Sequence, residues 1–194
     1  VWRQADRYGV PRVAFINKID RLGASFDRVL AEVRSRLGAN AAALQFPDAH
    51  ESDFKGIIDI VHDKYITYND EQGLEMVRSE IPEEFKEKVK EYKHTLIERL
   101  ADADDVIMEK FLEDKPLSTD DLKAGIRRAV IKNKFLPVLC GTALRNRGVQ
   151  LVLDAVCDYL PSPLDLPPTI GTDPSTKEKI TRNPAASDPL SALV

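Results

Sequence analysis

The side chains in this sequence with the clearest capacity for specific chemistry follow a short apolar run near its start. The run covers residues 13–16, and Asn17, Lys18 and Asp20 come directly after it. A short apolar run predicts a buried strand, and open α/β sheets bind ligands in the loops at the carboxyl ends of their strands. The sequence therefore predicts a ligand-binding loop at residues 17–20.

The carboxylate of Asp20 indicates which ligand this loop reads. An ionised carboxylate accepts two hydrogen bonds, and guanine offers a ring N–H and an exocyclic amino group side by side, whereas adenine presents an acceptor there. A site that depends on such bonds rejects the wrong base by about 10,000-fold, because a buried carboxylate would stay unpaired. We expect Asn17 to brace the loop and contact the base edge, and the stem of Lys18 to lie along the base face. The pattern predicts GTP or GDP rather than ATP as the ligand.

A second loop of the same kind follows the apolar residues 135–139. It contains Thr142, Ala143 and Leu144. A backbone N–H near Ala143 is expected to donate to the guanine O6 atom, and the small side chain lets the backbone approach the base. The tripeptide alone is a weak signal, but its place after a strand and downstream of Asp20 favours one guanine pocket made by both loops.

Five segments beyond the two loops, or extending them, are also recognisable: residues 2–11, 17–23, 54–56, 148–150 and 158–163. On these segments the chain resembles elongation factor G, the translocase GTPase of bacterial and organellar ribosomes. It resembles the C-terminal part of that family's GTP-binding domain, with its inserted subdomain. Members usually carry Ser-Ala where this chain has Thr142 and Ala143, so a hydroxyl is retained and the extra methyl group must fit beside the base. The resemblance covers nearly the whole chain and weakens at residues 41–51, 68–80 and after 168.

The resemblance implies a protein that hydrolyses GTP on the ribosome to move transfer and messenger RNA. The phosphate-binding pattern Gly-x4-Gly-Lys-Ser/Thr does not occur in this sequence. In the family this loop, the Mg2+ ligands and the catalytic histidine lie upstream, so we assign no catalytic or metal residue and expect the chain alone to be inactive. His50, His62 and His94 are expected to be structural or solvated.

Composition agrees with a soluble intracellular piece of a larger protein. The chain has 194 residues and a net charge of −4, and its two cysteines, Cys140 and Cys157, suit reduced thiols. No apolar run approaches the roughly 20 residues of a membrane span, and no secretory signal opens the chain. We expect the bacterial cytoplasm or an organellar matrix or stroma, with no DNA or membrane partner. The negative charge restricts contact with ribosomal RNA to local patches.

The hydrophobic pattern predicts an α/β fold: part of a P-loop GTPase-type sheet with an inserted small α+β subdomain, followed by a linker. Residues 1–37 and 134–162 are expected to form the GTP-binding part, with strands at 12–16 and 135–139 and helices at 25–37 and 148–160. Residues 38–133 are expected to form the insert, with strands at 54–60 and 64–68 and helices at 82–100, 104–112 and after Ser118. Residues 163–194 are expected to be a linker and the start of a β-barrel.

Three carboxylates of the insert form a candidate partner surface. Asp102, Asp105 and Glu109 share one side if the helix continues without a break. Charge on a helix is usually only a solvated face. In the elongation factor G family this subdomain contacts the mobile stalk protein of the large ribosomal subunit, which makes these carboxylates candidates for that contact.

Three alternatives remain open from the sequence. One is a paralogous GTPase on the same scaffold, such as a ribosome-recycling factor or a tetracycline-protection protein. Another is a non-catalytic module that binds the ribosomal stalk through the insert. The third is an unrelated α/β enzyme in which the guanine motif occurs by chance.

Overall fold

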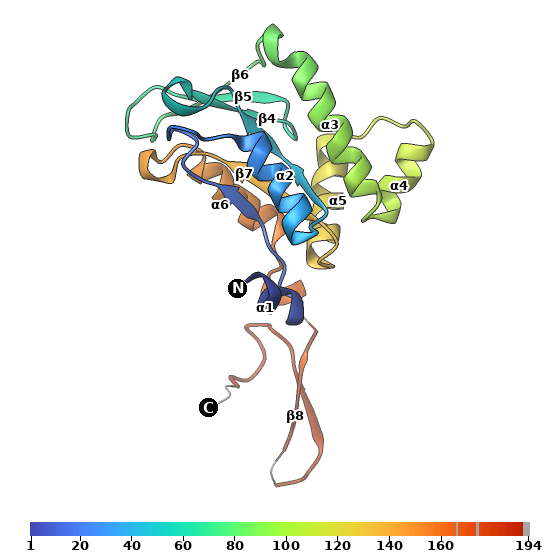
Figure 1. Ribbon diagram of the computed structural model, residues 1–194. Coiled ribbons are helices and arrows are strands. Elements are labelled where there is room, and N and C mark those ends of the chain that lie inside the picture. Colours follow the sequence, from blue (N-terminus) through green and yellow to red (C-terminus); the bar gives the residue numbers. More distant parts are fainter. Residues whose placement is uncertain (166, 174, 192–194) are drawn as a thin grey trace. The chain divides into compact units, whose positions relative to one another are not determined.

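The computed structural model describes residues 1–165, 167–173 and 175–191, which fall into two units, Val1–Leu160 and Pro161–Val194 (Figure 1). The chain is a mixed α/β protein, as the sequence predicts. Among the described residues, no helix combines the length and the apolar character needed to cross a membrane.

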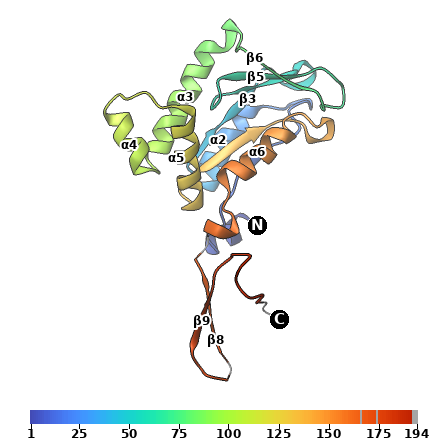
Figure 2. The same ribbon diagram turned by 180° about the vertical axis from the view of Figure 1, so that it is seen from behind.

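The first sheet of the larger unit has three parallel strands. β1 (Ala14–Ile16) and β2 (Ala41–Ala43) both pair with the central β7 (Leu136–Cys140). Every residue of β2 and β7 is buried, as expected of parallel strands whose two faces are covered by helices. In Figures 1 and 2, α2 (Phe26–Leu37) and α6 (Val149–Tyr159) lie on opposite sides of β7.

The second sheet is antiparallel, in the order β3-β4-β5-β6. The chain passes from the first sheet to the second through Leu44 alone, because β2 ends at Ala43 and the next strand begins at Gln45. The N–H of Leu44 donates to the carbonyl of Val138 on β7, at 2.9 Å. The strands are β3 (Gln45–Pro47), β4 (Gly56–Asp59), β5 (Lys64–Tyr68) and β6 (Met76–Ser79).

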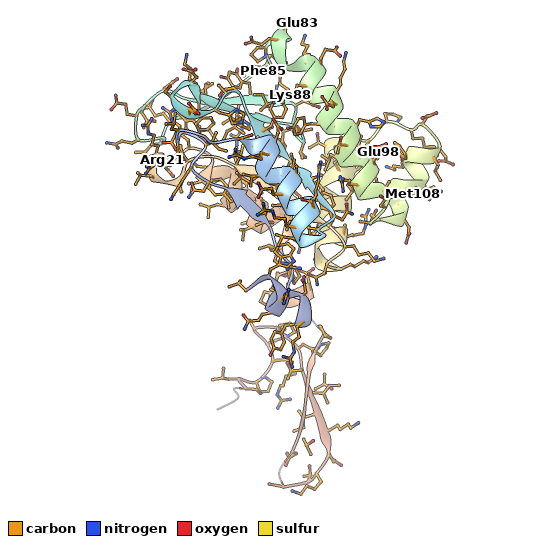
Figure 3. All side chains as sticks on the ribbon, in the orientation of Figure 1. Arg21, Glu83, Phe85, Lys88, Glu98 and Met108 are labelled. Atoms are coloured by element: carbon orange, nitrogen blue, oxygen red, sulfur yellow. The ribbon has the colours of Figure 1, made fainter. Side chains whose placement is uncertain are left out.

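Helices α3 (Lys86–Ala101), α4 (Asp105–Leu112) and α5 (Thr119–Ile131) pack together beside the sheets. Figure 3 shows Lys88 and Glu98 on α3 and Met108 on α4. Local signals set their ends: Ser118 and Asp121 form a reciprocal capping box at α5, and Asp104 caps α4. A short α1 (Trp2–Arg7) precedes β1, and the 3-10 turns are η1 (Glu51–Asp53), η2 (Glu83–Phe85), η3 (Ala143–Arg145) and η4 (Pro163–Asp165).

Helix α3 is joined to α2 and β3 by contacts of an aromatic residue, Tyr92. The hydroxyl of Tyr92 on α3 donates to the carboxylate of Asp27 on α2. The Tyr92 ring lies 4.8 Å from the ring of Phe46 on β3, and the ammonium of Lys88 lies 4.9 Å from the centre of the Phe46 ring. Aromatic pairs at this separation add to the stabilisation that burial alone gives.

Several predicted elements are confirmed, and three strands of the larger unit were missed. The helices expected at 25–37, 82–100, 104–112 and 148–160 correspond to α2, α3, α4 and α6. β2, β3 and β6 were not predicted, because three alanines carry little strand signal and β6 is largely exposed. β2 falls inside the range 38–133 that we assigned to the insert, yet it pairs with β7. We therefore propose that the insert begins after Ala43. The other domain boundaries remain predictions.

The smaller unit contains a hairpin where the sequence predicts only a linker. β8 (Thr169–Thr172) pairs antiparallel with β9 (Lys179–Arg182). The carboxylate of Asp173 accepts the N–H groups of Ser175 and Thr176, which closes the turn. The strands escaped prediction because their residues are mostly exposed and polar. The barrel strand expected at 190–194 lies mainly outside the described residues.

An ion pair between a buried carboxylate and a partly exposed guanidinium joins α4 to α5. Nε and Nη2 of Arg128 each lie 2.7 Å from a carboxylate oxygen of Asp104, whose side chain is 3% exposed. The hydrogen bonds from Arg128 hold the pKa of the Asp104 carboxyl below its ordinary value. The same carboxylate caps α4 by accepting the N–H of Ile107, so the pair and the helix start depend on each other.

Replacing Arg128 with Gln is expected to lower the free energy of unfolding at pH 7 by about 2 kcal/mol. Removing one partner of a fully buried pair costs about 3–5 kcal/mol, and here the guanidinium is 39% exposed. Because the pKa of Asp104 is lower in the folded state, its contribution is complete above the ordinary aspartate pKa of about 3.9 and is lost as the pH falls through the folded value. Urea unfolding should therefore show the wild-type advantage shrinking below about pH 4.

The control is Arg36→Gln, which removes a 3.4 Å pair with Glu32 on an exposed face of α2. We expect it to change stability by less than about 0.5 kcal/mol. An Arg128→Gln difference that stays constant with pH would contradict the assignment.

Candidate guanine-binding site

The two predicted loops leave the first sheet at the same edge. β1 and β7 run parallel with Ile16 opposite Cys140, so both chains enter their loops side by side. The N–H of Gly141 donates to the carbonyl of Ile16 at 3.1 Å, and the N–H of Ile19 donates back to the carbonyl of Gly141 at 3.2 Å. The strand pairing thus continues into the loops and fixes their separation.

A single side-chain oxygen joins the two loops. Oδ1 of Asn17 accepts the N–H of Lys18 at 2.8 Å and the N–H of Ala143 at 2.9 Å. Lys18 has a positive φ of 63°, which bends the chain back after β1. Asn17 therefore hydrogen-bonds to the backbone of both loops. We expected the N–H of Ala143 to donate to guanine O6, but in the structure it donates to Asn17. It can therefore donate to a base only if it shares its proton between the two acceptors or if Asn17 moves.

The side chain of Asp20 is mostly buried and lies close to an arginine of the second loop. The Asp20 side chain is 13% exposed, and Oδ2 lies 3.4 Å from Nε of Arg145 in the second loop. The preceding Ile19 is buried and fixes the backbone at that point. Arg145 is 58% exposed, so its guanidinium compensates the carboxylate while remaining free to turn into solvent. A base bound at Asp20 must join or displace this cation.

The second loop combines a buried end with an exposed apolar side chain. Thr142 is buried, and its N–H and carbonyl exchange hydrogen bonds with Arg147 at 2.9 and 3.1 Å. Leu144 is 89% exposed. Lys18 and Ala143 are exposed as well. The apolar surface of Leu144 therefore lies open beside the two loops, which suits a side chain that covers a base.

Residues of the insert support the second loop, and sequence reasoning missed them. The hydroxyl of Tyr68 on β5 accepts the N–H of Gly148 at 2.6 Å. The carbonyl of Gly73 accepts from Asn146 at 3.1 Å and from Gln150 at 2.7 Å. Gly73 has a φ of 66°, and a Cβ there would lie 2.4 Å from the carbonyl oxygen of Arg145. A turn-forming glycine at position 73 is a local signal in the sequence, but it does not show what the turn contacts.

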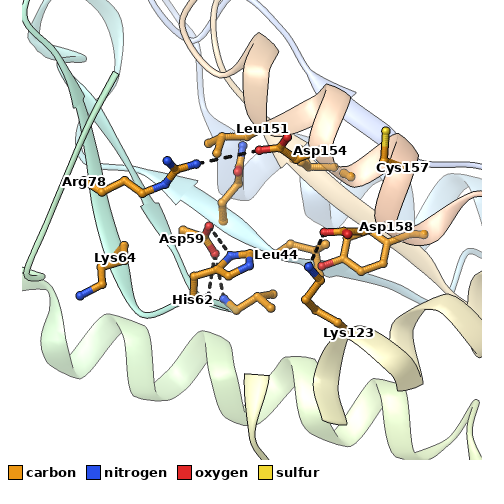
Figure 4. Close-up of a pocket in the computed structure, with 15 residues that line it drawn as sticks. Leu44, Asp59, His62, Lys64, Arg78, Lys123, Leu151, Asp154, Cys157 and Asp158 are labelled. Carbon is orange, nitrogen blue, oxygen red and sulfur yellow. Dashed lines mark hydrogen bonds and ion pairs between the residues drawn. The ribbon is translucent and has the colours of Figure 1, made fainter. Parts of the chain in front are cut away.

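A cavity of about 580 Å³ lies elsewhere, among β3 to β6, α5 and α6 (Figure 4). No predicted guanine-binding residue lines it. Its charged groups face one another: Asp59 lies 2.8 Å from His62, Lys123 lies 2.8 Å from Asp158, and Arg78 lies 4.0 Å from Asp154. The hydrogen bond from the imidazole to the Asp59 carboxylate raises the pKa of His62. We place the guanine chemistry at the loops, since these charges are engaged with each other.

The other two histidines also make structural contacts. Nε2 of His50 accepts the N–H of Phe26 at the start of α2, at 3.0 Å. His94 lies 3.3 Å from Glu98 on the exposed face of α3 and meets the ring of Phe111 edge-on. Among the residues that the structure describes, no group of three or more His, Cys, Asp or Glu side chains is arranged to hold a metal ion.

The candidate acidic surface is not on one continuous helix. α3 ends at Ala101, with Asp102 as its C-cap, and α4 begins at Asp105. The condition under which the three carboxylates would share a helix face is therefore not met across the break. All three are exposed, and Asp105 and Glu109 lie one turn apart on α4. Val106, which follows Asp105 in the sequence, is 48% exposed.

Comparison with known proteins gives a consistent result. Residues 1–162 match the family model of the elongation factor Tu GTP-binding domain. The chain is 48% identical to the elongation factor G of Amoebophilus asiaticus (strain 5a2) over 195 aligned positions, which cover 100% of this chain and 28% of that relative. A crystal structure of a Thermus thermophilus protein superposes with a TM-score of 0.74 and 26% identity, covering 93% of this chain and 28% of the other. The chain thus spans less than a third of the length of these proteins.

Proposed function

Because the chain belongs to the family of the elongation factor Tu GTP-binding domain and is similar along its whole length to an elongation factor G, we propose that it is part of a ribosomal translocase. The complete protein binds and hydrolyses GTP during polypeptide chain elongation. Within it, this chain supplies recognition of the guanine base. The observation that carries the proposal is the joining of two loops by Asn17 at one edge of a parallel sheet.

Each predicted residue has a role that its position supports. Asp20, 13% exposed and paired with a movable Arg145, accepts the ring N–H and the amino group of guanine. Asn17 keeps the two loops at a fixed distance. Lys18 and Leu144, both exposed, lie along the faces of the base, and Thr142 and Ala143 bring the backbone of the second loop to its edge.

The phosphate and Mg2+ chemistry belongs to other segments of the complete protein. This sequence holds no Gly-x4-Gly-Lys-Ser/Thr pattern, whose backbone amides and Lys would hold the phosphates. The chain by itself therefore offers hydrogen bonds to a base without the stronger electrostatic contacts to phosphate. We propose that it has no GTPase activity on its own.

The partner is the ribosome, through the complete protein acting in the bacterial cytoplasm or in an organelle. We propose that Asp102, Asp105 and Glu109, exposed around the α3–α4 break, contact the stalk protein of the large subunit. Contacts with ribosomal RNA are local, since the net charge of this chain is −4.

The first test replaces Asp20 with Asn in the full-length protein. Affinity for GTP is expected to fall by about 100-fold. A charge-assisted hydrogen bond is lost, and the NH2 group of the asparagine faces a guanine group that is itself a hydrogen-bond donor. Xanthosine triphosphate, whose 2-oxo group accepts from that amide, should gain affinity over wild type. Titration of fluorescent nucleotides measures both. The control is Asp53→Asn, an exposed carboxylate of η1, and unchanged base preference in Asp20→Asn would refute the proposed function.

A second test titrates the isolated 194-residue chain with a labelled GDP analogue, with and without Mg2+. The dissociation constant is expected to be about 100 μM or weaker, and insensitive to Mg2+, because the phosphate contacts are missing. Tight binding that depends on Mg2+ would place the phosphate site within this chain.

A third test neutralises the acidic surface in the full-length protein with Asp102→Asn, Asp105→Asn and Glu109→Gln together. Stalk-protein binding at low salt is expected to weaken about three- to tenfold through slower association, and the difference should fade at high salt. The control neutralises three exposed acids elsewhere, Asp53, Glu71 and Glu84. Equal losses in the two triple variants would show that general charge, and no defined surface, governs binding.

A further inference from the structure

Glu51, the first residue of η1, contacts the first guanine loop through both its backbone and its side chain. Its N–H donates to the carbonyl of Ile19 at 2.8 Å. Its Oε1 accepts the N–H of Gly23 at 2.8 Å. The residue lies 28 positions after Gly23 in the sequence, so these are tertiary contacts.

These two hydrogen bonds bracket Asp20. Ile19 immediately precedes the carboxylate residue and Gly23 follows it by three positions. The outer ends of the same segment are held from other directions: the N–H of Ile19 donates to Gly141, and the carbonyl of Gly23 accepts from Arg28 at 2.9 Å. The backbone is therefore held by hydrogen bonds both before and after Asp20. Glu51 makes one of these bonds on each side, to Ile19 and to Gly23.

The conformation of Glu51 itself depends on these contacts. Its φ is 59°, in the left-handed region that non-glycine residues seldom occupy. Such a backbone conformation is unfavourable in isolation and persists where surrounding interactions hold it in place. The neighbouring His50 accepts the N–H of Phe26, which ties the same short segment to the start of α2.

We propose that Glu51 is a positioning residue for guanine recognition, which sets the place of the Asp20 carboxylate by holding Ile19 and Gly23 without touching the base. The inference rests on the proposed function of Asp20. A carboxylate that must accept two hydrogen bonds from one base edge tolerates an error of only about 0.5 Å. Loss of the Glu51 acceptor leaves the N–H of Gly23 without its partner and frees that end of the segment.

Discrimination between GDP and inosine diphosphate provides the readout. Inosine keeps the ring N–H but lacks the exocyclic amino group, so the affinity ratio of the two nucleotides reports how well Asp20 reads that amino group. A change that only weakens the fold lowers both affinities and leaves the ratio unaltered. A displaced Asp20 lowers the ratio.

In the full-length protein, Glu51→Ala is expected to weaken GDP binding about tenfold and to lower the ratio of GDP to inosine diphosphate affinity by about fivefold. Glu51→Gln keeps an oxygen that accepts the Gly23 N–H, so its ratio should stay within about twofold of wild type. Asp53→Ala, which removes an exposed carboxylate from the same 3-10 turn, is the matched control and should change neither quantity. If Glu51→Ala fails to fold, Glu51→Asp replaces it, because the shorter side chain draws the acceptor away from Gly23.

The double variant Asp20→Asn/Glu51→Ala separates this inference from the proposed function. If Glu51 acts through Asp20, the double variant has the same ratio as Asp20→Asn alone. An unaltered ratio in Glu51→Ala, equal losses in the Ala and Gln variants, or additive losses in the double variant would overturn the positioning role while leaving Asp20 as the guanine reader. An unaltered ratio in Asp20→Asn would overturn both.

Discussion

The parallel pairing of β1 with β7 is the constraint on which the candidate site depends. It places Ile16 opposite Cys140, so that two loops separated by more than a hundred residues leave the sheet at neighbouring points. Asn17 then uses one carbonyl oxygen to hold the N–H groups of Lys18 and Ala143. Because the loops are short and hydrogen-bonded to each other, their separation follows from the spacing of adjacent strands.

The insert is part of this site's structure. Glu51 hydrogen-bonds to the first loop, and Tyr68 and Gly73 hydrogen-bond to the segment that follows the second. The connection is possible because β2 and β3 are separated by Leu44 alone, which keeps the antiparallel sheet next to the parallel one. The two candidate loops follow strands of the parallel sheet, whereas Glu51, Tyr68 and Gly73, which hydrogen-bond to them or to the segment after the second loop, lie between β3 and β6.

Three carboxylates that are largely buried each have a compensating partner. Asp104 is paired with Arg128 inside the helical layer, Asp20 has Arg145 at 3.4 Å, and Asp59 accepts two backbone N–H groups as well as contacting His62. The difference between the two arginine pairs lies in the exposure of the cation. Arg145 is 58% exposed and can leave at little cost, whereas Arg128 is 39% exposed and makes two short bonds. The pair between the two candidate loops, Asp20 with Arg145, is therefore the one suited to opening for a ligand.

Local apolar spacing, capping residues and side-chain chemistry were enough to predict β1 and β7, the two loops that follow them and most of the helices. The remaining features depend on contacts between segments that are far apart in the sequence. Ala41–Ala43 is a strand because it pairs with β7. Alanine has a low strand propensity, so the sequence does not predict this pairing. Glu51, Tyr68 and Gly73 support the loops through hydrogen bonds across long sequence separations, and the geometry of such bonds exists only once the sheets have formed.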